Sequence, residues 1–145
     1  MEERMERLQE YLAIIRTSAG WSAAQLGEKL GVSRQMISSL ENRRNKMTVM
    51  QYRAIRNVFS EEIEASPEED TKMMRDIIQI LVDEPEKYTE EQKRQVIESA
   101  NLLSPSVVAK KTTRSKASMA WVAAIAGVIV GTVAVGVKSY LDEKK

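Results

Sequence analysis

Two short helical stretches joined by only three residues constrain this chain more than any other feature. Ser22 and Gln25 have the spacing of a capping box, which favours a helix that begins after Ser22. Gly31 favours the end of that helix, because glycine readily adopts the left-handed conformation found at helix C-termini. Ser33 can cap a second helix that runs to about Asn42. A connection this short predicts two helices packed at a steep angle, the framework of a helix-turn-helix.

Further helices are predicted on both sides of this pair. Apolar residues recur at helical spacing over residues 3–17, which indicates a helix with one buried face. Thr48 and Gln51 form another capping box, and the helix that follows has an apolar side that reaches Phe59. We therefore expect an all-α fold whose first domain, a small helix-turn-helix bundle, covers residues 1–62.

The residues of this motif resemble a known family. The stretch from Ile15 to Phe59 is similar to the Cro/phage-repressor type of helix-turn-helix, also called the xenobiotic-response-element family. The residues that carry the resemblance are Gln25, Leu26, Gly27 and the run from Leu30 to Asn42. The resemblance implies that the domain binds double-stranded DNA with its second helix in the major groove. The residues that it implies as DNA contacts are Ser33, Arg34, Gln35, Ser38, Ser39, Asn42, Arg43, Arg44 and Lys46.

These implied contacts differ in what they would recognise. Arg34 can form two hydrogen bonds with a guanine and Gln35 with an adenine, so both would read bases. Arg43, Arg44 and Lys46 would meet phosphates, which adds affinity without sequence information.

Other positions of the resemblance concern structure rather than DNA. Arg16 and Glu41 occupy the places of an ion pair that, in the family, joins the first helix to the recognition helix. Three positions depart from the family pattern: Ala23 stands where a phosphate-binding Gln is common, Gly27 where Ala is usual, and Arg43 where Gly follows the recognition helix. At Gly27 the departure should cost about 1 kcal/mol of helix propensity.

Charge is strongly segregated along the chain. Residues 1–60 contain ten basic and six acidic residues, whereas residues 61–103 contain five basic and thirteen acidic residues. Residues 63–70 are predicted to be an acidic linker, and residues 71–103 to form an amphipathic helical hairpin with Pro85 in its turn. Three roles stay open for this hairpin: a dimerisation element, a module that binds a protein partner, or a spacer.

Residues 117–137 form a run of 21 residues without charge. As a helix the run would be about 31 Å long, close to the hydrocarbon thickness of a bilayer. We therefore expect a single transmembrane helix, with a basic linker before it over residues 104–116 and a short tail after it over residues 138–145. The protein would then be a single-pass protein of the cell membrane, with its N-terminal domain in the cytoplasm. The alternative is a helix buried in the protein core.

Ala123, Gly127 and Gly131 place small residues four apart on one face of this predicted span. Such faces allow two transmembrane helices to pack closely, so they predict a homodimer. A dimer suits a helix-turn-helix protein, because two copies can read two half-sites about one turn of DNA apart.

These features together predict a bacterial, membrane-anchored, sequence-specific transcriptional regulator that acts as a repressor. One alternative is a RodZ-like cytoskeletal or morphogenetic membrane anchor that binds protein through its helix-turn-helix, and another is a tether of DNA to the membrane. The outer face of residues 33–42 favours DNA, because it is rich in Arg, Gln and Ser. The chain has no Cys and no His, and its carboxylates have no partner residues typical of an active site, so we expect no enzyme, no metal site and no cofactor.

Overall fold

Helices account for the regular structure of the chain in a computed structural model, which describes residues 1–108 and 114–128. The elements are α1 (Glu2–Glu10), α2 (Leu12–Ser18), α3 (Ala23–Leu30), α4 (Arg34–Glu41), α5 (Val49–Ala65), the 3₁₀-helix η1 (Glu68–Asp70), α6 (Lys72–Ile77), the π-helix η2 (Ile78–Asp83), the 3₁₀-helix η3 (Pro85–Lys87), α7 (Glu90–Val108) and α8 (Arg114–Ala124). No strand occurs among the described residues, so the predicted all-α fold is confirmed for them.

The capping signals of the sequence begin helices where they were expected. Both capping boxes, at Ser22 and Thr48, are complete, and each hydroxyl accepts a hydrogen bond from the backbone N–H three residues later. Gly31 ends α3 in the left-handed conformation, with a φ of 73°. Ser33 caps α4, because its hydroxyl accepts a hydrogen bond from the Met36 N–H at 3.1 Å. Local sequence therefore sets both ends of α3 and the starts of α4 and α5.

The helix predicted over residues 3–17 is interrupted at Tyr11, which separates α1 from α2. Tyr11 has a φ of −105° and a ψ of 12°, outside the usual α-helical range. The apolar stripe continues across the interruption, and Leu8, Leu12 and Ile15 are fully buried. The periodicity therefore predicted the buried face correctly but not the interruption.

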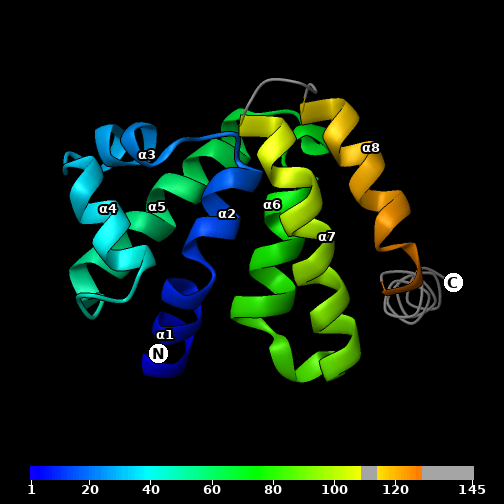
Figure 1. The fold of residues 1–145 in the computed structure, drawn as a ribbon, viewed down its shortest axis with the longest axis horizontal. Coiled ribbons are helices and arrows are strands. Elements are labelled where there is room, and N and C mark those ends of the chain that lie inside the picture. The colour runs from blue at the N-terminus through cyan, green and yellow to red at the C-terminus, as the bar shows by residue number, and fades with distance from the viewer. Residues whose placement is uncertain (109–113, 129–145) are drawn as a thin grey trace, which may run out of the picture.

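One hydrophobic core joins the N-terminal helices to the acidic middle of the chain. Phe59 of α5, Ile77 of α6 and Val96 of α7 all belong to it. In Figure 1, α7 lies beside α2, and the two helices pack together, as do η2 and α1. Met73 and Met74 are buried in the same core, so they do not form an exposed surface for a partner.

Arginines of α1 and α5 also hold the C-terminal end of η2. Arg7 Nε donates a hydrogen bond to the Val82 carbonyl at 2.8 Å. Arg56 donates two hydrogen bonds to the Asp83 carboxylate, at 2.9 and 3.0 Å, and Arg4 lies 3.4 Å from the same carboxylate. The acidic middle is therefore attached to the N-terminal helices by directional bonds as well as by apolar packing.

Helical structure extends into two segments that the sequence suggested would be irregular. α5 continues to Ala65 and η1 covers Glu68–Asp70, so most of the predicted linker at residues 63–70 is helical. α7 continues through Pro105 to Val108, past the end expected from its proline. Pro105 has no backbone N–H, so the continuation lacks one i to i−4 hydrogen bond at that point.

The predicted location at the cell membrane is contradicted, and the predicted transmembrane helix over residues 117–137 is not supported by the helices that the structure describes. Among the described residues, no helix is both long enough and apolar enough to cross a bilayer. α8 has 11 residues, a length of about 16 Å. α8 packs on α6 and α7, and Trp121 in α8 and Ile125 just after it are fully buried, so one side of the described part of the apolar run lies in the protein core. Residues 129–137 of the predicted span lie outside the described residues.

A hydrogen bond between side chains fixes α8 to α6. The Trp121 indole N–H donates to Asp76 Oδ2 at 2.9 Å, and Lys72 Nζ lies 3.0 Å from the same carboxylate. Asp76 is buried, so these two donors satisfy a carboxylate that would otherwise be costly to remove from water. Figure 1 shows α8 at the opposite end of the molecule from α3 and α4.

Candidate nucleic-acid interface

α3 and α4 approach each other closely at one end of the molecule, on the left of Figure 1. The Val32 N–H donates to the Gly27 carbonyl at 2.8 Å. A Cβ atom on Gly27 would lie only 2.7 Å from the Val32 carbonyl oxygen, a distance that side-chain carbons essentially never adopt. In this chain α3 and the turn after it therefore approach more closely than a Cβ at position 27 would allow without a shift of the backbone, so glycine fits this contact although it lowers helix propensity.

α4 has one buried side and one polar side. Ile37 and Leu40 are buried together with Leu26 of α3, which locks the two helices. Arg34 and Gln35, the residues implied to read bases, are both exposed in the first turn of α4. The core thus holds the backbone of α4 in place while these two side chains point to solvent.

The smaller polar residues of the predicted interface take part in bonds within the chain. Ser33 uses its hydroxyl as the cap of α4. Asn42 is exposed at the end of α4, and its side-chain amide donates to Ser38 Oγ at 3.3 Å. Ser39 is half-buried, and its carbonyl accepts a hydrogen bond from the Arg44 N–H at 2.9 Å. These bonds shape α4 and the start of the following loop.

The predicted pairing of Arg16 with Glu41 is confirmed. Arg16 donates two hydrogen bonds to the Glu41 carboxylate, at 2.6 and 3.0 Å, and a third to the Trp21 carbonyl at 2.8 Å. Both side chains are mostly buried, with 13% and 11% of their surface exposed. The pair joins the C-terminal end of α2 to the C-terminal end of α4, so it holds α4 in position.

The loop after α4 carries the three cations that were predicted to meet phosphates. Arg43, Arg44 and Lys46 are all exposed. Arg43 has a φ of 58°, in the left-handed region that favours glycine, at the position where the resemblance leads one to expect glycine. The backbone of the family's turn is therefore retained although the residue differs.

Gln9 of α1 holds this loop in place, a role that the motif did not reveal. Its side-chain amide donates to the carbonyls of Leu40 at 3.1 Å and Asn45 at 2.6 Å, and its oxygen accepts from the Met47 N–H at 3.0 Å. Met47 is itself buried and anchors the loop to the core. The one available signal in the sequence was a polar residue on the apolar face of the first helix, four residues after Met5.

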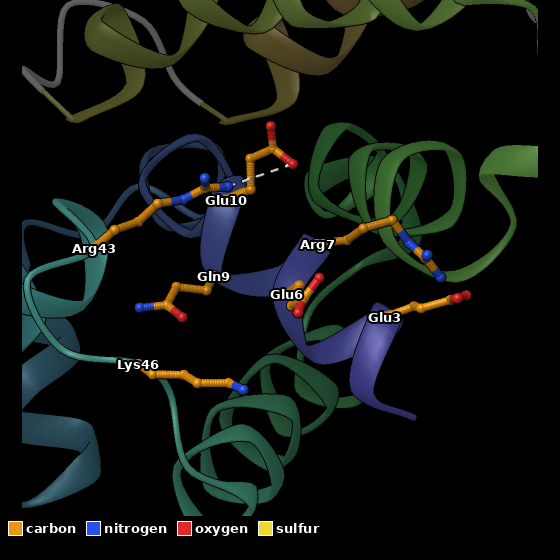
Figure 2. A pocket seen from close by; sticks show the side chains of 7 residues that line it. All are labelled: Glu3, Glu6, Arg7, Gln9, Glu10, Arg43 and Lys46. Carbon is orange, nitrogen blue, oxygen red and sulfur yellow. Dashed lines mark ion pairs between the residues drawn. The ribbon is translucent and has the colours of Figure 1, made fainter.

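α1 also reaches the cations of the loop through its carboxylates. Glu10 lies 3.5 Å from Arg43, and Glu2 lies 3.4 Å from Lys46. Burial raises the pKa of the neighbouring Tyr11, as do the charges of Glu10 and Glu90, whereas Arg43 opposes this increase. Figure 2 shows Gln9 pointing from α1 toward the loop between Arg43 and Lys46, with the ion pair to Glu10 drawn as a dashed line.

Apolar side chains at the start of α5 are a further feature that the motif did not predict. The Gln51 amide lies 3.9 Å from the sulfur of Met36, which places the first turn of α5 beside the first turn of α4. Met50 and Val49 in that turn are 82% and 43% exposed. Apolar groups next to a base-reading helix can contact the methyl group of thymine.

Comparison with known proteins identifies this part of the chain. Residues 12–68 match a family model described as helix-turn-helix, and this range contains α2, α3, α4 and α5. No curated protein and no solved structure matches the chain. The matched range begins after α1, so the acidic first helix lies outside it. Residues 12–68 therefore form a helix-turn-helix domain of the Cro/C1 type, a DNA-binding regulatory family.

Proposed function

We propose that the chain is a sequence-specific DNA-binding regulator of transcription in which α4 enters the major groove. The observation that carries the proposal is the contrast between the two sides of α4. Ile37 and Leu40 fix the helix in the core, while Arg34 and Gln35 stand exposed in its first turn. An Arg and a Gln at the N-terminal end of a rigid recognition helix suit bidentate contacts with guanine and adenine.

The loop after α4 would supply the sequence-independent part of the affinity. Arg43, Arg44 and Lys46 are exposed on a loop that Gln9 and the buried Met47 hold in position. Contacts with phosphates orient a protein on the duplex and make its affinity fall as salt rises. We therefore expect these three residues to raise the affinity for all DNA sequences alike. Arg34 and Gln35 are expected to distinguish one sequence from another.

The surface of α4 disfavours a protein-binding role of the RodZ type. A face that docks on a filament would be expected to expose apolar or aromatic side chains. The exposed residues of α4 are polar, and its apolar residues are buried or half-buried. Both the RodZ-like role and the DNA-to-membrane tether need a membrane anchor, and no helix among the described residues is long and apolar enough to supply one.

We further propose that two copies act together on the operator. A single α4 presents few base-reading side chains, so one copy would specify only a short sequence, and two copies would specify two half-sites. Two of the small residues predicted to mediate self-association are exposed, Ala123 in α8 and Gly127 just after it, and Gly131 lies outside the described residues. Because α8 and α4 lie at opposite ends of the molecule (Figure 1), a dimer through α8 would read widely separated half-sites.

The test is selection of fragments from the source genome with the purified full-length chain. The Arg34→Ala/Gln35→Ala variant should lose the enriched sites, because each bidentate contact is worth about 1–3 kcal/mol of discrimination. A matched control is Gln79→Ala/Arg94→Ala, which removes the same residue types from exposed positions on η2 and α7. Equal loss in both variants, or no enrichment by the folded wild-type chain, would count against sequence-specific reading.

The direction of regulation is tested on a selected site. We propose repression, so a reporter gene placed behind that site should be less active when the wild-type chain is present. The Arg34→Ala/Gln35→Ala variant should restore its activity. A reporter that becomes more active with the wild-type chain would instead identify an activator.

A further inference from the structure

The cations proposed to meet DNA phosphates are not all equivalent in the free protein. Arg43 and Lys46 each have a carboxylate partner on α1, at 3.5 Å for Glu10 and 3.4 Å for Glu2. Arg44 stands in the same loop and forms no ion pair within the part of the chain that the structure describes. Two of the three cations are therefore already neutralised by groups that carry the same charge as a phosphate.

The position of α1 makes this arrangement a property of the fold rather than of flexible side chains alone. The three hydrogen bonds of Gln9 hold α1 against the loop, and Arg7 ties the same helix to Val82. α1 also precedes the residues that match the helix-turn-helix family, which begin at Leu12. The hydrogen bonds of Gln9 and Arg7 therefore hold α1 so that Glu2 and Glu10 lie beside the loop after α4.

Both ion pairs remain open to solvent, so a ligand can reach them. The exposed fractions are 58% for Arg43 and 49% for Glu10, and 68% for Lys46 and 73% for Glu2. The open hollow in Figure 2 is lined by Arg43, Lys46 and carboxylates of α1. Exposed pairs of this kind are weak and exchange readily, which allows a phosphate to replace the carboxylate.

We infer that Glu2 and Glu10 compete with DNA phosphates for Lys46 and Arg43, so that α1 acts as an internal inhibitor of DNA binding. The inference rests on the proposed function, because it concerns the same phosphate contacts. α1 lowers affinity for every DNA sequence alike and leaves the reading of bases by Arg34 unchanged. The ratio of specific to non-specific affinity therefore stays the same while the affinity for all DNA falls.

The experiment measures binding of the full-length chain to a short fluorescein-labelled duplex of random sequence, by fluorescence anisotropy. Removal of both pairs in Glu2→Gln/Glu10→Gln should tighten binding about fivefold at about 50 mM salt, and much less at about 200 mM salt, where exposed charges are more strongly screened. The control is Glu3→Gln/Glu6→Gln, which removes the same charge from the same helix. Glu3 and Glu6 line the same hollow but form no ion pair among the described residues, so this variant should change affinity less than about twofold.

A double-mutant comparison separates the pairs from net charge. Arg43→Gln should weaken binding more in the Glu10→Gln background than in the wild-type chain, whereas the effect of Arg44→Gln should be the same in both. Equal tightening by the two double Glu variants, or an unchanged effect of Arg43→Gln, would overturn the inference. Circular dichroism of each variant checks that α1 remains helical.

The result also separates this inference from the proposed function. If the wild-type chain selects no genomic site while Glu2→Gln/Glu10→Gln still binds random duplex more tightly than its control, the proposed sequence-specific function fails and the inference stands. If genomic sites are enriched but the two double Glu variants behave alike, the inference fails and the proposed function stands. If no variant binds duplex at about 50 mM salt, both are wrong.

Discussion

The two ends of the molecule offer a direct comparison, because α4 and α8 are both short helices with one buried side. The exposed side of α4 is polar, with Arg34 and Gln35 in its first turn. The exposed side of α8 from Met119 onward is apolar, with Met119 74% exposed and Val122 44% exposed. An exposed polar side is ordinary for a surface helix, and on α4 it follows from local signals such as the cap at Ser33.

The comparison teaches why one end was predicted correctly and the other was not. A helix-turn-helix is specified by residues close together in sequence, so a cap, a turn glycine and apolar spacing identify it. An uncharged helix is compatible with lipid on all sides or with a protein core on one side, and its composition does not distinguish the two. The described part of the run packs on the protein, because Trp121 is buried against Asp76, a residue 45 positions away.

The substitution with the largest expected effect on stability is Trp121→Ala. Trp121 is fully buried, so its truncation should lower the free energy of unfolding by about 3–5 kcal/mol. Urea denaturation followed by circular dichroism measures the change. The control is Met119→Ala on the exposed side of the same helix, which should change stability by less than about 0.5 kcal/mol. If α8 did not pack on α6 and α7, the two variants would be equally stable.

A matched pair of glycine substitutions tests the two ends with the same chemical change. Gly27→Ala should destabilise the protein by about 1–3 kcal/mol, because the new Cβ would lie 2.7 Å from the Val32 carbonyl oxygen. Gly127→Ala should be neutral or stabilising by up to about 1 kcal/mol, because a Cβ there meets nothing within 4 Å and alanine favours the helix. Urea denaturation of both variants measures the change in the free energy of unfolding. A stable Gly27→Ala protein would show that the turn relaxes easily and that α3 and α4 are less tightly joined.

Gly127→Leu has the smallest expected effect on stability. It tests whether two copies of the chain associate through the exposed small residues in and just after α8. The open space around Gly127 means that leucine should not disturb the fold of a single chain. If two copies associate through Ala123 and Gly127, the mass measured by light scattering should fall from that of a dimer to that of a monomer. Glu98→Leu, an added apolar residue at an exposed position of α7, is the control. A dimer that persists in Gly127→Leu would place the contact elsewhere.

The candidate interface shows the same division between local and long-range information. Arg34 and Gln35 could be placed on the outer side of a helix from spacing alone, and their exposure agrees with this. Gln9 could not be connected with the loop at Asn45, because the two residues are 36 positions apart and an isolated glutamine carries no motif. The same holds for the carboxylates of Glu2 and Glu10, which look like an ordinary solvated face until α1 is seen against the loop.

The sequence by itself determined the local geometry of this protein: where α3, α4 and α5 begin, where α3 ends, and which side of each helix is apolar. Capping boxes, turn glycines and helical periodicity act over a few residues, so no knowledge of the rest of the chain is needed to read them. Only the tertiary structure decided what the apolar and charged surfaces contact. It placed one side of α8 in the protein core, packed the acidic middle against α1 and α2, and set carboxylates of α1 beside Arg43 and Lys46 of the loop after α4. These outcomes depend on contacts between distant residues, whose partners are fixed only when the core is packed.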